Sequence, residues 1–433
     1  MKTNHVTKYL LSASLIVNLQ AQTFTIDELI MLSLENSPDL QVSHLNYKAS
    51  QSRYDSAFAS YLPQVDLLAS GGKIAMSDMA NPASNTLLED TLLLGKLSVN
   101  QILYDFGKRG GNVDNLEYRS QAYNFQDKQN ISNKIKDVKG AYYTVLKTAA
   151  LIDVQKENVK LNEAQVYRSQ KYFEAGIRTK IDVSDAKVFL IQAKLQLKNV
   201  EYELKSAYAL LDKTVGFLDT QEEYSLQTQK LNLNTLYNSL YQYDLSLQES
   251  IDFAYKNRAE LQKYAMEIEA STSKIEQFDS EYYPELFLSA DYTKQQLDTL
   301  SSFTPEDQWQ ATVNLNWNLY AGGASNARVE ESKLLTKSSE YQYTYSKLAI
   351  KKEITDAYIN VNRSKDFVEL AQSLVQVSAQ KFEQASKRYE HGLSDYIELQ
   401  QARQEYIDAK AKLVADYYDY YIAIANLDNA IGK

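Results

Sequence analysis

The segment from Gln308 to Tyr320 alternates apolar and polar residues more regularly than any other part of the chain. Its apolar positions are Trp309, Ala311, Val313, Leu315, Trp317 and Leu319. The positions between them are uncharged and polar, namely Gln310, Thr312, Asn314, Asn316 and Asn318. Because successive side chains of a strand point to opposite faces, this pattern predicts a strand with one apolar and one wet face. Such a strand fits an outer-membrane barrel, which has lipid outside and water inside.

Both tryptophans of the chain fall on the apolar face of this strand. Eight residues separate them, which corresponds to roughly 20 Å along the membrane normal at the usual rise and tilt of barrel strands. That is the spacing of the two aromatic girdles at the membrane interfaces. We therefore expect Trp309 and Trp317 to form a membrane girdle.

Weaker versions of the alternation predict three more strands, so that the expected strands cover about residues 64–74, 92–104, 285–294 and 308–320. In the second of these, Gln101 and Ile102 break the pattern. A single strand of this kind also suits an amphipathic sheet packed on a soluble core. Four of them without charges on their apolar faces favour a lipid-facing wall.

Two proline-free runs, from about Lys108 to Tyr172 and from about Ala324 to Tyr389, predict helices of about 60 residues, roughly 90 Å long. The helix after the first run carries a heptad seam at Val183, Ala186, Leu190, Ala193, Leu197, Val200, Leu204, Ala207 and Leu211. A neighbouring stripe repeats every seven residues at Ile181, Val188, Leu195, Tyr202 and Ala209. Two seams let a helix pack on both sides, as in the wall of a cylinder. For the helices alone, an ordinary antiparallel coiled coil remains the alternative.

The sequence contains an internal repeat, in which one structural unit occurs twice. TIDELIMLSLENSPDL at Thr25 aligns with SLQESIDFAYKNRAEL at Ser246, a shift of 221 positions, and further along the shift becomes 216. Each copy reads as helix, two strands, long helix, tip turn and helix, with Pro63 or Pro284 ending the first helix. We expect repeat 1 at residues 22–216, an equatorial linker at 217–245 and repeat 2 at 246–433.

Four strands cannot close a barrel, since closure needs about eight or more. In lipid every backbone polar group must be paired, so an open sheet edge is not tolerated there. Several copies of the chain must therefore pool their strands around an axis, and this predicts a cyclic homo-oligomer.

Composition narrows the possibilities further. Residues 1–21 read as a secretory signal peptide, with Lys2 and Lys8 before an apolar stretch. The chain has no cysteine, so we expect no disulfide, no thiolate chemistry and no lipid-anchored N-terminus. The net charge of −10 argues against nucleic acid as a partner. The histidines His44 and His391 lack Ser, Cys or metal-ligand partners at recognisable spacing, so we expect no enzyme, no cofactor and no metal.

Taken together, several motifs make the chain resemble the TolC-like outer-membrane factor family throughout its mature length. They are NSPDL at Asn36, YLP at Tyr61, ILYDFGKR at Ile102, NLYAGG at Asn318, and the paired tips FEAGIRTKIDV at Phe173 and YEHGLSDYIEL at Tyr389. The resemblance implies a mainly α-helical homotrimer, with four strands per protomer in one shared 12-stranded transmembrane β-barrel. A long periplasmic α-helical barrel would continue it. It also implies contact with outer-membrane lipid, a periplasmic adaptor (membrane fusion) protein and an inner-membrane pump.

The same resemblance implies site residues at the periplasmic tips. A gate carboxylate of the second copy matches Glu398, and the next one falls on Gln401. A linking aspartate matches Asp182 and its tyrosine partner matches Tyr389, while its arginine partner falls on Ser394. The gate is therefore expected at Asp182, Asp185, Tyr389, Ser394, Glu398 and Gln401. Adaptor contacts are expected at Phe173, Gly176, Ile177, Tyr389, Gly392 and Leu393.

The gate carboxylates have a simpler alternative role. Thr179 with Asp182, and Asp395 with Glu398, have the spacing of a capping box at the start of the returning helix. Gly176 and Gly392 suit sharp turns, because glycine enters left-handed geometry freely.

The sequence thus predicts the passive exit duct of a tripartite efflux pump or type I secretion system in the outer membrane, reaching into the periplasm. The alternative is the periplasmic adaptor itself, a coiled-coil hairpin carried on small β domains. The twofold repeat and the tryptophan-flanked strand argue against an adaptor, which has one hairpin and no lipid-facing strand.

Overall fold

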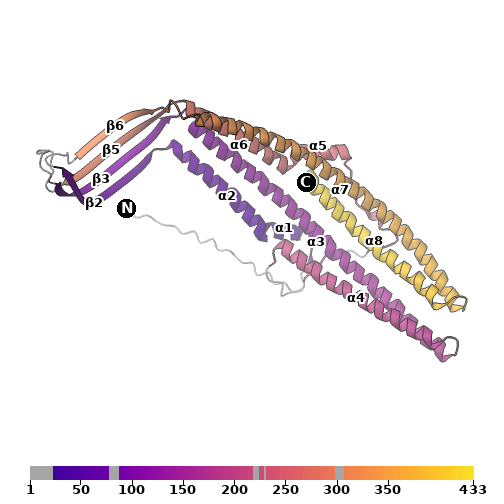
Figure 1. The fold of residues 1–433 in the computed structure, drawn as a ribbon. Helices are drawn as coiled ribbons and strands as arrows, with labels where there is room; N and C mark the ends of the chain where they lie inside the picture. Colours follow the sequence, from indigo (N-terminus) through magenta and orange to yellow (C-terminus); the bar gives the residue numbers. More distant parts are fainter. Residues whose placement is uncertain (1–22, 78–86, 218–223, 229–230, 298–306) are drawn as a thin grey trace.

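Figure 1 shows the protein, a computed structural model, as a small sheet joined to a long array of helices that ends in two hairpin tips. The structure describes residues 23–77, 87–217, 224–228, 231–297 and 307–433. The expected signal peptide at residues 1–21 lies outside the described residues.

Four strands form one antiparallel sheet in the order β2-β3-β5-β6. They are β2 (Gln64–Ser77), β3 (Leu87–Tyr104), β5 (Glu285–Leu297) and β6 (Asp307–Asn316). The register pairs Gln64 with Asn100, Gln101 with Leu288 and Glu285 with Asn316. Within the described residues, β2 and β6 each pair on one side only, so both are edge strands.

Three strands extend beyond their expected bounds, since β2 ends at Ser77, β3 begins at Leu87 and β5 ends at Leu297. Two further details concern β6 and the end of β3. β6 ends at Asn316 rather than at residue 320, because the Asn318 side chain accepts a hydrogen bond from the Tyr320 backbone N–H at 3.2 Å and turns the chain toward the next helix. In β3 the register shifts between Ile102 and Tyr104. Gln101 and Ile102 come before the shift and still pair regularly with Leu288 and Phe287, so the shift does not account for the broken alternation there.

The first helix of each copy is in fact two helices. They are α1 (Ile26–Asn36) and α2 (Pro38–Phe58), and α5 (Leu247–Asn257) and α6 (Ala259–Asp279). The break residues are both extended, with φ −70° and ψ 118° at Ser37 and φ −67° and ψ 121° at Arg258. Pro38 explains the first break. The second lacks a proline, and sequence patterns did not predict it. Short 3-10 turns, η1 (Ala59–Tyr61) and η3 (Ser280–Tyr282), then lead through Pro63 and Pro284 into the sheet.

The long helices are α3 (Lys108–Glu174) and α7 (Ala324–Glu390), of 67 residues each, or roughly 100 Å. Each turns back at a tip into a helix of 36 residues, α4 (Lys180–Val215) or α8 (Tyr396–Ile431). In Figure 1 the α3–α4 and α7–α8 hairpins extend side by side away from the sheet. Among the helices of the described residues, none is both long and apolar enough to cross a membrane.

The segment between the copies contributes two short elements, β4 (Ser225–Leu226) and η2 (Tyr237–Ser239). β4 pairs in parallel with β1 (Thr23–Phe24), so the segment between the copies is tied to the start of the first one. Two-residue strands carry too little alternation to be predicted from sequence.

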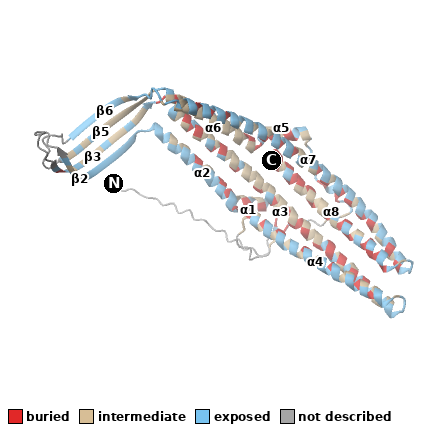
Figure 2. Ribbon diagram, viewed as in Figure 1, coloured by how far each residue is buried: buried red, intermediate tan, exposed pale blue. Residues whose placement is uncertain are grey.

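Buried positions run along the helices and are sparse in the sheet (Figure 2). On α4, the buried part of the first heptad seam is Val183, Ala186, Ala193, Val200, Ala207 and Leu211. All five members of the second series, from Ile181 to Ala209, are exposed in the single chain. The first seam therefore closes the hairpin, and the second faces outward without a partner in this chain.

Candidate functional site

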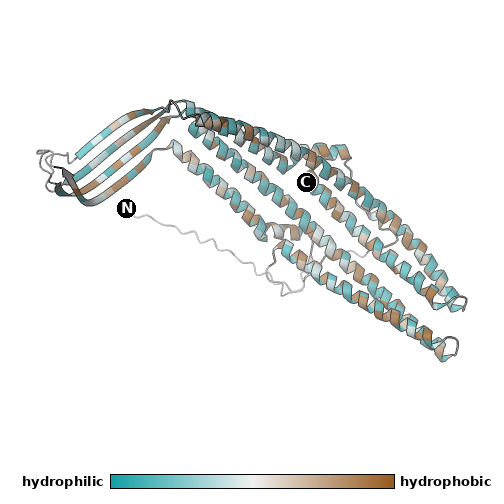
Figure 3. Ribbon diagram, viewed as in Figure 1, coloured by the Kyte–Doolittle hydropathy of each residue, from teal (hydrophilic) through white to brown (hydrophobic). Residues whose placement is uncertain are grey.

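Large apolar side chains remain exposed on the sheet. Trp309 is 78% exposed and Val313, Leu315 and Trp317 are also exposed, while β2 exposes Leu67. Apolar and polar residues alternate along all the strands in Figure 3. Trp309 lies on β6 opposite Tyr292. Trp317 lies just past the strand, where its indole N–H donates to the Tyr282 carbonyl oxygen at 3.1 Å.

The two tips share one backbone design. Gly176 and Gly392 are left-handed, with φ 72° and 74°. The backbone N–H of Ile177 donates to the Tyr172 carbonyl and that of Leu393 to the Arg388 carbonyl, both at 2.9 Å. These five-residue-back bonds are those of a Schellman helix ending, in which a left-handed residue lets the chain satisfy the last carbonyls. The expected role of both glycines as turn formers is therefore what the geometry shows.

The two returning helices are capped differently. In the first tip the carboxylate of Asp182 accepts bonds from the N–H and the hydroxyl of Thr179, both at 2.9 Å. In the second tip Asp395 is the cap, and its carboxylate accepts from the Glu398 backbone N–H at 2.8 Å. Asp182 is thus engaged in its own helix start, whereas the Glu398 side chain is left free for another partner.

The Glu398 carboxylate lies 3.2 Å from Nε of Arg388, on the same hairpin. One turn further along α8, the Gln401 amide donates to Glu405 at 3.2 Å, and Glu405 pairs with Lys381 of α7 at 2.5 Å. Glu398 therefore links α8 to α7 through Arg388, while Gln401 contacts Glu405, which makes a second link to α7 through Lys381.

Tyr389 and Ser394 do come together, around an arginine that was not expected. Nη2 of Arg178, from the first tip, donates to the backbone carbonyl of Ser394 at 3.1 Å and reaches that of Tyr389 at 3.5 Å. Its guanidinium carbon lies 4.8 Å from the centre of the Tyr389 ring. Tyr389 itself is 1% exposed, so in this conformation its ring is not part of the tip surface.

Behind the tips, aromatic rings of both hairpins meet. The ring centres of Phe189 and Tyr396 are 5.8 Å apart, and those of Tyr172 and Tyr389 are 6.5 Å apart. Burial raises the pKa of Tyr396, and the nearby charge of Asp185 adds to the shift. Asp185 lies on α4, and its charge acts on Tyr396 of the second hairpin.

Deeper between the hairpins lies Arg403, which is 2% exposed. Its Nη1 donates to Asn162 of α3 at 2.8 Å and to Gln400 at 3.1 Å. Burial lowers the pKa of this guanidinium, although Tyr396 opposes the shift. An arginine remains charged even so, and its partners here are neutral amides.

The remaining tip residues form an apolar rim. Phe173, Ile177 and Leu393 are all exposed, with Leu393 at 70%. These side chains are accessible for a partner, as the sequence prediction requires of an adaptor contact.

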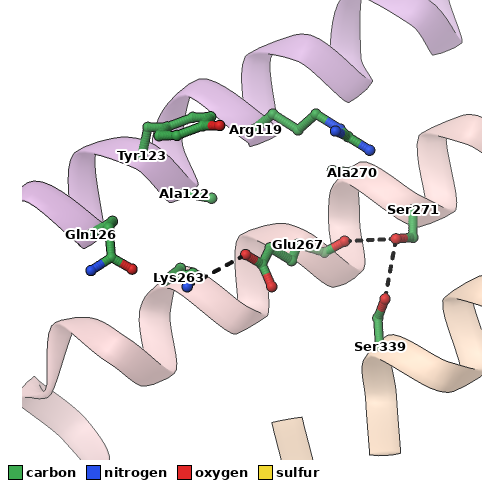
Figure 4. Close-up of a pocket in the computed structure, with 9 residues that line it drawn as sticks. All are labelled: Arg119, Ala122, Tyr123, Gln126, Lys263, Glu267, Ala270, Ser271 and Ser339. Carbon is green, nitrogen blue, oxygen red and sulfur yellow. Dashed lines mark hydrogen bonds and ion pairs between the residues drawn. The ribbon is translucent and has the colours of Figure 1, made fainter. Parts of the chain in front are cut away.

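A pocket of about 410 Å³ lies between α3, α6 and α7 (Figure 4). Its polar groups are paired locally: Lys263 lies 3.8 Å from Glu267, and the Ser271 hydroxyl donates to the Glu267 backbone carbonyl at 2.9 Å. This pattern is that of serines inside helices rather than of a nucleophile beside a base. Across the part of the chain that the structure describes, no three His, Cys, Asp or Glu side chains are grouped to hold a metal.

Sequence reasoning missed Arg178, Arg388 and Arg403. One signal could have found the first of them: the 216-residue shift between the copies maps Arg178 onto Ser394, the position where an arginine was expected. The other two act through helix-face geometry that spacing alone does not reveal.

Comparison with known proteins gives a consistent result. A model of the family described as "Outer membrane efflux protein" matches residues 29–216 and 251–433. The chain is 22% identical to the antibiotic efflux pump outer membrane protein ArpC of Pseudomonas putida, over 94% of this chain and 82% of ArpC. It is also 22% identical to the outer membrane protein TolC of Vibrio cholerae, over 92% and 88%. Its fold is similar to that of the CmeC outer membrane channel of Campylobacter jejuni, with a TM-score of 0.83 at 16% identity over 94% of this chain and 85% of CmeC.

Proposed function

The chain belongs to the outer membrane efflux protein family, and on that premise we propose that it is the passive exit duct of an export pump, closed at its periplasmic tip by its two helical hairpins. As a member of the family it is an outer-membrane channel that extends into the periplasm. The observation that carries the proposal is a four-stranded sheet with two open edges and exposed apolar side chains, set on helices of 67 residues.

The open edges support a trimer. A lone four-stranded sheet would leave unpaired backbone groups in lipid, whereas three copies supply a closed ring of about twelve strands. The helices support the same assembly, because α4 and α7 both expose apolar stripes. On α4 these are Ile181, Val188, Ile191, Leu195, Tyr202 and Leu210, and on α7 they include Leu348, Ile359, Leu370 and Val377. Exposed stripes of this length indicate surfaces that a neighbouring copy covers.

The sheet is the part that meets lipid. Trp309 toward one end of β6 and Trp317 beyond the other end are both exposed, which supports a pair of interfacial girdles.

The tips support a gate and a docking surface. The proposed gate comprises Asp182, Asp185, Tyr389, Ser394, Glu398 and Gln401, and the proposed adaptor contact is the exposed rim with Phe173, Ile177 and Leu393. A periplasmic adaptor and an inner-membrane pump are the partners this implies, consistent with the relative that is part of an antibiotic efflux pump. The family model and the relatives are those of outer-membrane channels, which does not support the alternative that the chain is the periplasmic adaptor itself.

The test uses the purified full chain in detergent. We expect a trimeric mass by light scattering and channels in planar bilayers, and a monomer that is soluble without detergent would refute the assembly. Replacing Asp182 and Glu398 together by alanine should raise the conductance. Asp395→Ala serves as the matched control, because it removes a helix cap worth about 1 kcal/mol but leaves both carboxylates in place. If the double variant and the control conduct alike, Asp182 and Glu398 have structural roles only.

A further inference from the structure

One arginine of the pocket between α3, α6 and α7 has no partner of its own. Among the described residues, the guanidinium of Arg119 makes no hydrogen bond and no ion pair, and in Figure 4 it extends from α3 along the pocket. The other charged groups of the lining, Lys263 and Glu267, lie 3.8 Å apart on α6. The lining therefore has one positive charge in excess, in a chain whose net charge is −10.

The charge of Arg119 acts on a second cation, Lys274 of α6. Burial lowers the pKa of Lys274, and the charge of Arg119 lowers it further. The Lys274 ammonium donates to the side-chain oxygen of Gln277 at 2.8 Å, which is a neutral acceptor. Two like charges that repel each other destabilise the site when it is empty. A bound anion would be attracted by both of them.

The pocket is long enough for a molecule of several rings or bonds. Its α6 residues run from Lys263 to Ser271, which corresponds to about 12 Å along the helix. Arg119 lies toward the Ala270 end, because Asn115, one turn before it on α3, donates to the Ala270 carbonyl at 2.5 Å. The unpaired positive charge is therefore at one end of the pocket, and the Lys263 side chain is at the other.

The middle of the pocket is apolar. The methyl groups of Ala122 and Ala270, both buried, lie between α3 and α6, and the ring of Tyr123 beside them is 41% exposed. A volume of about 410 Å³ is within the range of sites for small organic molecules, which combine an apolar surface with a few polar groups. This lining fits a ligand that has a flat apolar body and an anionic group at one end.

The position of the pocket favours a soluble ligand over a membrane lipid. Arg119 follows Lys108, the first residue of α3, by 11 positions, or about 17 Å of helix. With the sheet in the membrane, as proposed above, a lipid headgroup stays at the membrane surface and does not reach that far. All of the lining residues belong to one chain, so a second copy is not needed to build the site.

From these observations we propose that this pocket is a binding site for a small organic anion. The carboxylate or sulfonate of the ligand pairs with the guanidinium of Arg119, whose planar fork of donors matches two oxygens. The flat body of the ligand lies against the Tyr123 ring, and Lys263 and Gln126 border the other end. The inference rests on the proposed function only for the position of the sheet.

The experiment compares two probes, biphenyl-4-carboxylate and its neutral counterpart biphenyl-4-carboxamide. The full chain in phosphatidylcholine nanodiscs is titrated by calorimetry, with empty nanodiscs as the blank. We expect the carboxylate to bind roughly tenfold more tightly than the carboxamide, the effect of one charge-assisted hydrogen bond. Arg119→Ala should remove this difference, and Arg119→Lys should keep part of it because lysine has no planar fork. Tyr123→Ala should weaken both probes alike.

Arg363→Ala is the matched control. Arg363 is also an exposed arginine of a long helix, but it bonds to Asn360 of its own helix at 2.5 Å and does not line the pocket. This variant should bind both probes as the parent does. Equal affinity of the parent for the two probes, or parental affinity for the carboxylate in Arg119→Ala, would overturn the inference.

Thermal unfolding separates a binding role from a structural one. Because Arg119 makes no bond and repels Lys274, Arg119→Ala should keep the parental midpoint or raise it slightly. A lower midpoint would assign Arg119 a structural role and count against the site. A parent that binds the carboxylate but forms no channel in planar bilayers would contradict the proposed function and leave this inference standing.

Discussion

The ends of α4 and α8 each pack against the break between two shorter helices, and the two junctions use different residues for similar contacts. In the first copy α4 ends at the left-handed Gly216 against the break at Ser37, and in the second copy α8 ends at Gly432 against the break at Arg258. In the first, Lys134 of α3 bridges Asp39 at 2.8 Å and the Thr214 carbonyl at 3.4 Å.

In the second junction the cation comes from the break residue itself. Arg258 bridges Glu260 at 2.8 Å and the Ala430 carbonyl at 2.8 Å, and it also pairs with Glu353 of α7 at 2.7 Å. The shifts between the copies map Asp39 onto Glu260 and Thr214 onto Ala430, but Lys134 onto the buried Ile350. The acceptors therefore keep their places, while the donor changes helix. What the two junctions share is a position for positive charge, not a residue that supplies it.

The tips repeat this relation. In the first tip Asp182 caps the returning helix, and Arg178 bonds to the other hairpin. In the second tip Asp395 is the cap, and Glu398 pairs with Arg388 of the same hairpin. Equal backbone turns thus leave different carboxylates and cations available, and the two tips are chemically unequal.

The largest predicted effect comes from the glycines. A Cβ at Gly216 would lie 2.9 Å from the Asn36 carbonyl oxygen, and one at Gly432 would lie 3.1 Å from the Arg258 Cα, while nothing lies within 4 Å at Gly176. Gly216→Ala adds a clash to the left-handed strain and should cost about 3 kcal/mol, whereas Gly176→Ala should cost about 1 kcal/mol. Thermal unfolding followed by circular dichroism in detergent should rank the midpoints Gly216→Ala, Gly432→Ala, Gly176→Ala from lowest to highest. Equal midpoints would mean that the junction yields to the extra atom.

The second-largest predicted effect comes from replacing the cations of the two junctions, Arg258 and Lys134. Arg258 binds two carboxylates and a carbonyl, and its side chain is 5% exposed, whereas the carboxylate partner of Lys134 is 68% exposed. Arg258→Met should therefore cost about 2 kcal/mol and Lys134→Met about 1 kcal/mol, because hydrated carboxylates lose less when a partner is removed. The same thermal unfolding measures both. The reverse order would show that the donor's helix, and not its set of acceptors, determines the stability.

Moving the arginine of the second junction into the first tests whether only the position of the positive charge matters. Ser37 and Arg258 have the same backbone conformation, so Ser37→Arg with Lys134→Ile would rebuild the second junction in the first copy. The double variant should recover part of the stability lost in Lys134→Ile alone. No recovery would contradict the view that only the position of the charge matters.

The sequence predicted what is encoded locally. Alternation found the strands around Val65, Leu97 and Val313, and the absence of proline over long runs found the long helices to within a few residues. It failed where the cause lies far along the chain. The break at Arg258 has no proline to mark it and depends on acceptors at Glu353 and Ala430. Arg178 could be named from the repeat, but not its targets, because the orientation of one hairpin on another follows from tertiary packing.

The smallest predicted effect is a pH dependence of the unfolding midpoint that arises at the first junction, from Asp39 and Lys134. Burial acts to raise the pKa of Asp39, but hydrogen bonds from Lys134 and Ser37, together with the lysine's charge, outweigh it and lower the pKa. A lowered pKa means that the carboxylate stabilises the fold when ionised. That stabilisation is complete above the unfolded value of about 3.9 and is lost as the pH falls through the folded pKa. Because Asp39 is largely exposed, water and salt screen the pair and the effect is small. Between about pH 5 and pH 3, the unfolding midpoint of the parent should fall slightly more steeply than that of Asp39→Asn or Lys134→Met. A parental slope in Asp39→Asn would assign the acid sensitivity to other carboxylates.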